Sequence, residues 1–163
     1  MSEGTLPGWL PAPLREPTSW WKSAGLGWAL AFGGSLILSA LVSRLFPSLG
    51  TPRFPVSGAY AFFLLVIFSP LVETLIMGGA LLLLLRFLPP GAAIVVSAVG
   101  WGIAHSTAAP AWGLIIWWPF LILSTLFVAW RERGIGAAMG IAALTHALQN
   151  LVPGTFVALG LPG

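Results

Sequence analysis

Long apolar runs that carry almost no charge constrain this chain more than any other feature of its sequence. The runs cover residues 24–45, 58–88, 92–106, 111–130 and 135–151. A helix needs about 20 predominantly apolar residues to span a bilayer. Charged residues make up only 7% of the chain and hydrophobic ones 58%, whereas soluble domains carry about 25% charged residues. The pattern predicts an all-α, polytopic membrane helix bundle of about five transmembrane helices in a lipid bilayer.

The first 23 residues differ from the rest of the chain. They are rich in proline, which breaks helices, and they end in Trp20, Trp21 and Lys22, residue types that favour the membrane interface. We therefore expect residues 1–23 to form an interfacial segment and residues 24–163 to form one transmembrane domain. The opening residues lack the early apolar core of a cleavable leader, so the first span is expected to act as an uncleaved signal-anchor.

Proline and glycine positions suggest local details of the spans. The run at 58–88 is too long for one upright helix, and Ser69–Pro70 offers a point where it can break. The tail from Pro153 is short and is expected to lie in the interface. Gly136 and Gly140 form a small-xxx-small pattern, which lets a neighbouring helix approach closely.

The few basic residues indicate orientation rather than nucleic-acid binding. They number seven, give a net charge of +3, and are scattered without a nucleic-acid motif. Five spans place Arg15, Lys22, Arg86, Arg131 and Arg133 on one side and Arg44 and Arg53 on the other. Because basic loops stay in the cytoplasm, this split favours a cytoplasmic N-terminus in a bacterial cytoplasmic membrane. The chain has no cysteine, which excludes disulfides, thiolate ligands and a cysteine nucleophile.

Polar groups inside the spans are the candidates for chemistry. Glu73 is the one charged side chain deep in a predicted span, and both histidines, His105 and His146, also lie in apolar runs. A carboxylate at the centre of a membrane helix costs about 2.5–3.5 kcal/mol on insertion scales, so its presence indicates a role. Asn150 follows His146 by four residues, on the same helix face. The order of the spans predicts that these four groups share one half of the bilayer.

Such a set can serve more than one chemistry. A carboxylate can take a proton from a bound water as general base, while histidines and an amide hold the water and stabilise an oxyanion. Glu73, His105 and His146 could instead ligate a metal such as zinc and leave an open position for water. Both routes hydrolyse an amide bond. Glu73 alone could also serve a small proton-coupled transporter, although the chain lacks the two-half repeat of transporters.

Three ordered motifs resemble the CPBP family, the CAAX proteases and bacteriocin-processing enzymes also called Abi. That family carries Glu-Glu-x-x-x-Arg, Phe-x-x-x-His and His-x-x-x-Asn/Asp on successive membrane helices. Here residues 70–78, 101–105 and 145–150 are similar to them, within a core of about residues 60–151. The resemblance implies an intramembrane (metallo)endopeptidase that cuts a peptide or membrane-protein substrate. Glu73 would activate water, His105 would help to hold it, and His146 and Asn150 would position the substrate carbonyl and support the oxyanion.

Two positions depart from the family pattern. Thr74 stands in place of the second Glu and Gly78 in place of the Arg. If the Glu and Arg of the family pattern form an ion pair, losing both leaves no unpaired buried charge, whereas losing only one would leave such a charge. The departures leave open a catalytically degenerate member that acts as a membrane binding or scaffold protein. The side of the membrane that the site faces is also undecided. CAAX-type members open their site to the cytoplasm, whereas the distribution of basic residues puts the half of the bilayer that holds the four groups on the outside.

Overall fold

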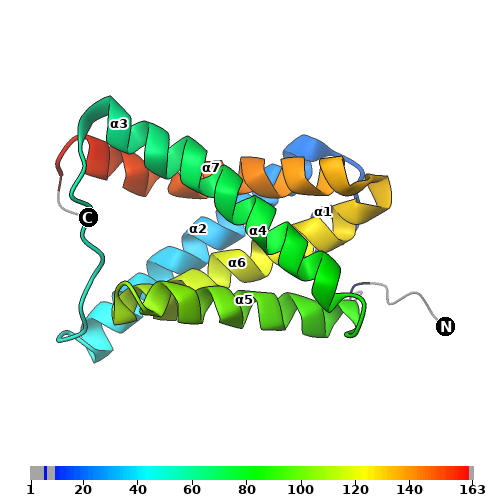
Figure 1. Ribbon diagram of the computed structural model, residues 1–163, viewed down its shortest axis with the longest axis horizontal. Coiled ribbons are helices and arrows are strands. Elements are labelled where there is room, and N and C mark those ends of the chain that lie inside the picture. Colours follow the sequence, from blue (N-terminus) through cyan, green and yellow to red (C-terminus); the bar gives the residue numbers. More distant parts are fainter. Residues whose placement is uncertain (1–5, 7–9, 162–163) are drawn as a thin grey trace.

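Helices make up all the regular structure that the computed structural model describes, which covers residue 6 and residues 10–161. The elements are α1 (Ala12–Arg15), α2 (Trp20–Leu45), α3 (Gly58–Phe62), the π-helix η1 (Phe63–Phe68), α4 (Ser69–Leu84), α5 (Pro90–Ser106), α6 (Pro110–Trp130), the 3₁₀ turn η2 (Arg131–Arg133) and α7 (Ile135–Ala158). The segment from α3 to α4 is one continuous helix. The long helices run back and forth along the longest axis of the molecule (Figure 1).

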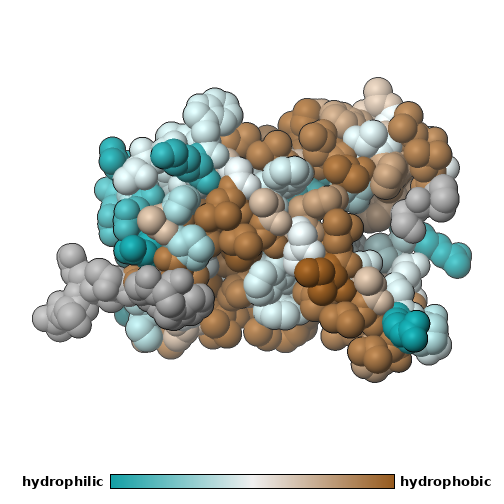
Figure 2. Space-filling model, turned by 180° about the vertical axis from the view of Figure 1, so that it is seen from behind, coloured by the Kyte–Doolittle hydropathy of each residue, from teal (hydrophilic) through white to brown (hydrophobic). Residues whose placement is uncertain are grey.

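Four of these stretches are long and apolar enough to cross a membrane. They are Trp20–Leu45, Gly58–Leu84, Pro110–Arg133 and Ile135–Ala158. α5 has 17 residues, which at 1.5 Å per residue is about 26 Å, against a hydrocarbon core of about 30 Å. The chain is thus an all-α, multi-pass membrane protein, and the predicted count of about five spans is not confirmed. Hydrophobic surface covers the middle of the molecule, with hydrophilic groups gathered toward its ends (Figure 2).

The core is organised around α6, the most deeply buried of the four candidate spans. Its residues Leu123 and Phe127 have no exposed surface, and α2, α5 and α7 all pack against it. The indole of Trp118 lies over Gly34 of α2, where a Cβ would collide with the ring, and its Nε1 donates to the Leu30 carbonyl at 2.9 Å. Small residues on α2 therefore let α6 occupy the centre of the bundle.

The second span is not broken at Ser69–Pro70, so a break, one of the two ways in which its length could be accommodated, does not occur. A π-helical stretch absorbs the disturbance, and Ser69 N donates to the carbonyl five residues back, on Leu64. In this register the next carbonyl, that of Leu65, would need the N–H of Pro70, which proline lacks. The amide of Asn150 on α7 supplies the missing donor, with Nδ2 3.0 Å from Leu65 O. The helix continues because another helix satisfies its free carbonyl.

The structure adds two details to the last span. α7 passes through Pro153 and ends at Ala158, so the residues directly after Pro153 are part of the helix. Proline is tolerated there because its fixed φ suits a helix and it removes only one backbone hydrogen bond. A Cβ on Gly140 would lie 2.8 Å from the Trp20 ring, while nothing lies within 4 Å at Gly136. Gly140 therefore makes room for an aromatic ring, not for a neighbouring backbone.

The N-terminal segment packs onto the bundle, although residues 1–5 and 7–9 lie outside the described part. α2 already begins at Trp20, whose ring centroid is 4.9 Å from that of Trp130. Ser23 Oγ donates to the Pro13 carbonyl at 2.6 Å and accepts from Trp130 Nε1 at 3.2 Å. Leu14 of α1 is 1% exposed. Because Leu14 is buried and α1 packs against α6 and α2, this part of the predicted interfacial segment belongs to the packed bundle.

Candidate active site

Both histidines of the chain face the same oxygen of Glu73. Nε2 of His105 lies 3.9 Å and Nε2 of His146 lies 3.7 Å from Glu73 Oε2. The three side chains come from α5, α7 and α4, and they are 11%, 5% and 22% exposed. The distances exceed those of direct hydrogen bonds, so the three groups surround a common point rather than bond to one another.

The opposite nitrogen of each imidazole is held by a partner. His105 Nδ1 lies 2.9 Å from the carbonyl of Trp101, one turn earlier on α5. Because a carbonyl only accepts, this nitrogen carries the proton, and Nε2 of a neutral His105 is an acceptor. His146 Nδ1 lies 3.4 Å from Thr74 Oγ1, a hydroxyl that can donate or accept. These contacts turn Nε2 of both rings toward Glu73.

Aromatic side chains fix the positions of the histidines. The His105 ring meets Trp112 edge-on with centroids 4.6 Å apart, and it tilts against Trp101 at 5.7 Å. Phe120 of α6 stacks on Trp101 with centroids 4.3 Å apart and meets His146 edge-on at 5.2 Å. A continuous aromatic group thus joins the two histidines. Edge-to-face and offset contacts of this kind contribute about 0.5–1.5 kcal/mol per pair beyond burial.

Neighbours on α4 support the carboxylate and fill the space around it. Ser69 Oγ donates to Glu73 Oε1 from one turn earlier, which leaves Oε2 for the histidines. Thr74 is 1% exposed and contacts His146. Added to Gly78, a Cβ would lie 2.8 Å from Phe127 Cε2, so the bundle has no room for an arginine there. Position 74 therefore provides a hydroxyl contact to His146, and position 78 is closely packed.

Two polar residues of α7 extend the site beyond His146. Asn150 contributes to the same cavity wall as Glu73, but its Nδ2 donates to Leu65 O, so one of its two N–H groups is engaged. Gln149 is 7% exposed, and its Nε2 donates to Ser35 Oγ on α2 at 3.2 Å. Within the described residues, its Oε1 is the one fully covered side-chain oxygen or nitrogen without a hydrogen-bond partner.

These groups line a cavity of about 820 Å³ that is partly open to the outside. Its walls come from α2, the 46–57 loop, η1, α4, α5, α6 and α7, at the end of the bundle where α2 and α7 finish (Figure 1). The ionisable side chains of the wall, among the described residues, are Glu73, His105 and His146. The volume falls in the range typical of ligand pockets, which are largely apolar with a few convergent polar groups.

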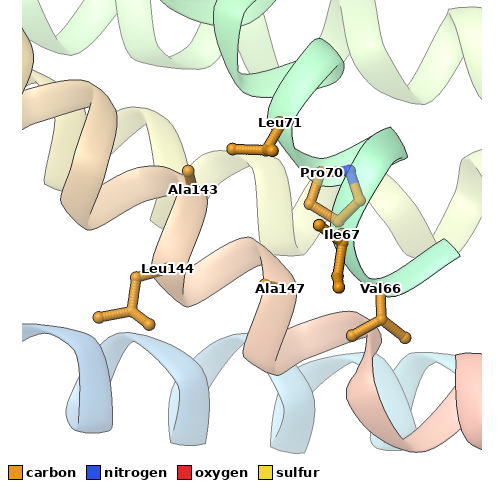
Figure 3. Close-up of a pocket in the computed structure, with 7 residues that line it drawn as sticks. All are labelled: Val66, Ile67, Pro70, Leu71, Ala143, Leu144 and Ala147. Carbon is orange, nitrogen blue, oxygen red and sulfur yellow. The ribbon is translucent and has the colours of Figure 1, made fainter. Parts of the chain in front are cut away.

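A second, smaller crevice of about 200 Å³ lies on the other side of α4. It is lined by seven apolar residues of η1, α4 and α7, among them Pro70, Leu71 and Ala147. Figure 3 shows these side chains along the groove between the two helices. None of the described residues that line this crevice has a polar side chain, so the crevice offers no catalytic group.

A zinc ion does not fit the three donor groups as they stand. Zinc at about 2.0–2.1 Å from its ligands holds neighbouring donors of a tetrahedron about 3.3 Å apart, shorter than the 3.7 and 3.9 Å found here. In the described part of the chain, no group of three or more His, Cys, Asp or Glu side chains could hold a metal ion. The roles of Glu73, His105 and His146 as metal ligands therefore stay an untested expectation.

Sequence reasoning missed several residues that shape the site. Ser69 and Thr74 could have been found, because polar residues four before and one after a buried carboxylate are unusual in an apolar span. Gln149 gave the same signal, as a polar residue three positions after His146. The aromatic contacts of Trp112 and Phe120 had no sequence signal, since aromatic residues are frequent throughout this chain.

Comparison with known proteins adds no family assignment. No protein-family model matches the chain, and neither a curated protein nor a solved structure matches it.

Proposed function

We propose that this protein is an intramembrane endopeptidase that hydrolyses a peptide or membrane-protein substrate with water activated by Glu73. The observation that carries the proposal is the approach of both imidazole Nε2 atoms to Glu73 Oε2 inside a cavity of the helix bundle. Burying a carboxylate and two histidines in lipid is costly, and a packing role would not require their polar atoms to face one point. The ordered resemblance to the CPBP motifs supports the same reaction.

In the proposed reaction, a water molecule lies between Glu73 and His105. Its two hydrogens donate to Glu73 Oε2 and to His105 Nε2, the acceptor set by the Trp101 carbonyl. The water oxygen attacks the carbonyl carbon of the scissile amide, and Glu73 takes the proton as general base. Cleavage of the C–N bond passes that proton from Glu73 to the departing nitrogen, which yields an amine and a carboxylic acid that keeps the second water hydrogen. Proton exchange between the two products then gives a carboxylate and an ammonium group.

His146 has the complementary role in this proposal. If Thr74 Oγ1 donates to Nδ1, then Nε2 of His146 carries the proton and donates to the carbonyl oxygen as it becomes an oxyanion. The second N–H of Asn150 can assist from one turn further along α7. In this proposal Thr74, which stands where the resembling family has its second Glu, orients His146 by a hydrogen bond. That role favours a working enzyme over a degenerate one.

The experiment is a search for cleavage by the purified protein in nanodiscs. A panel of prenylated and unprenylated peptides and short membrane proteins is incubated with it, and products are identified by mass spectrometry. We expect at least one substrate to be cut at a defined internal bond. Specific binding without any product, from a protein with a cooperative thermal unfolding transition, would contradict the proposal and favour a scaffold or binding protein.

A further inference from the structure

The unpartnered amide oxygen of Gln149 is a polar feature of the cavity that the proposed reaction does not use. Its Oε1 is buried and receives no hydrogen bond, although the residue forms part of the wall that also holds Glu73. A buried acceptor without a donor carries a desolvation cost that a bound partner relieves. The terminal torsion of a glutamine has a broad minimum, so the amide can turn Oε1 into the cavity, at the cost of the Nε2 bond to Ser35 Oγ.

The backbone beside Gln149 has a related feature. The main-chain carbonyl of Gln149 would normally accept from the residue four positions later, which is Pro153 and has no N–H. Pro153 also lines the cavity. Position 149 therefore has two acceptors, one on the side chain and one on the main chain, that lack their usual donors.

The spacing along α7 relates this residue to the scissile bond. Gln149 follows His146 by three residues, a rise of about 4.5 Å toward the open end of the cavity. An extended peptide advances about 3.4 Å per residue. A peptide with its scissile carbonyl at His146 therefore brings a backbone N–H near Gln149 about one residue away from that bond.

The conformation of the substrate follows from the same feature. An intact helix uses its backbone N–H groups internally, so only an extended segment has one free for Gln149. Among the described residues the wall has no lysine or arginine to pair with a terminal carboxylate, which matches an internal segment.

We propose that Gln149 is a substrate-binding residue whose Oε1 accepts a backbone N–H within one or two residues of the scissile bond, so that the cavity takes an uncharged polypeptide segment in extended conformation. This inference rests on the proposed function, whose site it extends by one helical turn.

The test pairs Gln149→Met with N-methylated substrates. Gln149→Met keeps the length of the side chain and removes the acceptor, so we expect KM to rise about tenfold with kcat changed less than twofold. N-methylation of the backbone nitrogen that binds Gln149 should raise the KM of wild type about tenfold. The same methylation should hardly change the KM of Gln149→Met, because that variant has already lost the acceptor. The control is Ser124→Ala, which removes a buried hydrogen bond to Ser97 away from the cavity and should leave KM unchanged.

Two results would overturn the inference. One is an unchanged KM in a folded Gln149→Met protein, and the other is N-methyl penalties that are equal in both proteins at every position. If wild type cuts no peptide, the proposed function fails separately. Binding of the same peptides to Glu73→Gln and to Glu73→Gln/Gln149→Met then tests Gln149. We expect binding to the double variant to be about tenfold weaker. Equal binding to both variants, or no binding to either, would contradict the role of Gln149.

Discussion

The hydrogen bond between Asn150 and the Leu65 carbonyl allows a prediction about stability. Pro70 cannot donate to this carbonyl, and Ser69 N is already engaged with Leu64 O, so Asn150 Nδ2 is the donor that satisfies it. The change Asn150→Leu keeps a similar side-chain size and leaves the carbonyl unpaired. Because η1 continues directly into α4, which carries Glu73, the loss should also disturb the carboxylate.

The expected magnitude follows from the partial burial of the pair. An unsatisfied buried polar group costs about 1–3 kcal/mol, and interhelical hydrogen bonds in membrane proteins average about 0.6 and reach about 1.7 kcal/mol. We therefore expect Asn150→Leu to lower the free energy of unfolding by about 1–2 kcal/mol. For a chain of this length, that corresponds to a decrease in Tm of about 2–8 °C.

Thermal unfolding in one detergent, followed by circular dichroism or intrinsic tryptophan fluorescence, measures this effect. The matched control is Thr155→Val, which removes a bond from a hydroxyl to the Leu151 carbonyl within α7 itself and should change Tm by less than about 1 °C. A Tm of Asn150→Leu equal to that of wild type would refute the reasoning that Asn150 satisfies the carbonyl freed by Pro70.

Three further predictions concern the reaction. Thr74→Val, which keeps the side-chain shape but removes the hydroxyl beside His146, should lower kcat about two- to tenfold, whereas Thr74→Ser should retain most activity; equal rates for both variants would exclude a role of the hydroxyl. His105→Ala should remove most activity from a protein that is still folded at the assay temperature, although the lost aromatic contacts should lower its Tm; normal turnover would assign His105 to packing alone. Because the donor groups do not fit zinc, cleavage should persist after dialysis against a strong chelator, and loss of activity restored by added metal would contradict the metal-free mechanism.

The sequence predicted the class of fold because bilayer burial leaves a strong compositional signal. Uninterrupted apolar runs and the near absence of charge require membrane helices, and helices of this kind are what the structure contains. The fine structure of the second and last spans could not be predicted in the same way. Pro70 and Pro153 predict helix disruption locally, yet the Asn150 amide from another helix and the tolerance of a single lost bond keep both helices intact.

The candidate residues could be identified because ionisable groups in lipid are rare. Glu73, His105 and His146 stood out for that reason alone, and their order along alternating spans predicted one shared depth. Their detailed contacts were not predictable, since the Thr74 and Trp101 partners that orient the imidazoles depend on how helices rotate about their axes. Packing of large and small residues, such as Trp118 over Gly34, sets that rotation, and a single sequence does not specify it.

Substitution of Glu73 by glutamine tests the central claim most directly. Glu73→Gln keeps the size of the side chain and an acceptor for Ser69, but it removes the base that takes the proton of water. Cleavage of the best substrate by this variant is compared in nanodiscs with wild type and with Glu132→Gln, an exposed carboxylate in η2. The account predicts at least a hundredfold loss for Glu73→Gln with an unchanged Tm, and full activity for Glu132→Gln. Undiminished cleavage by a folded Glu73→Gln protein would contradict it.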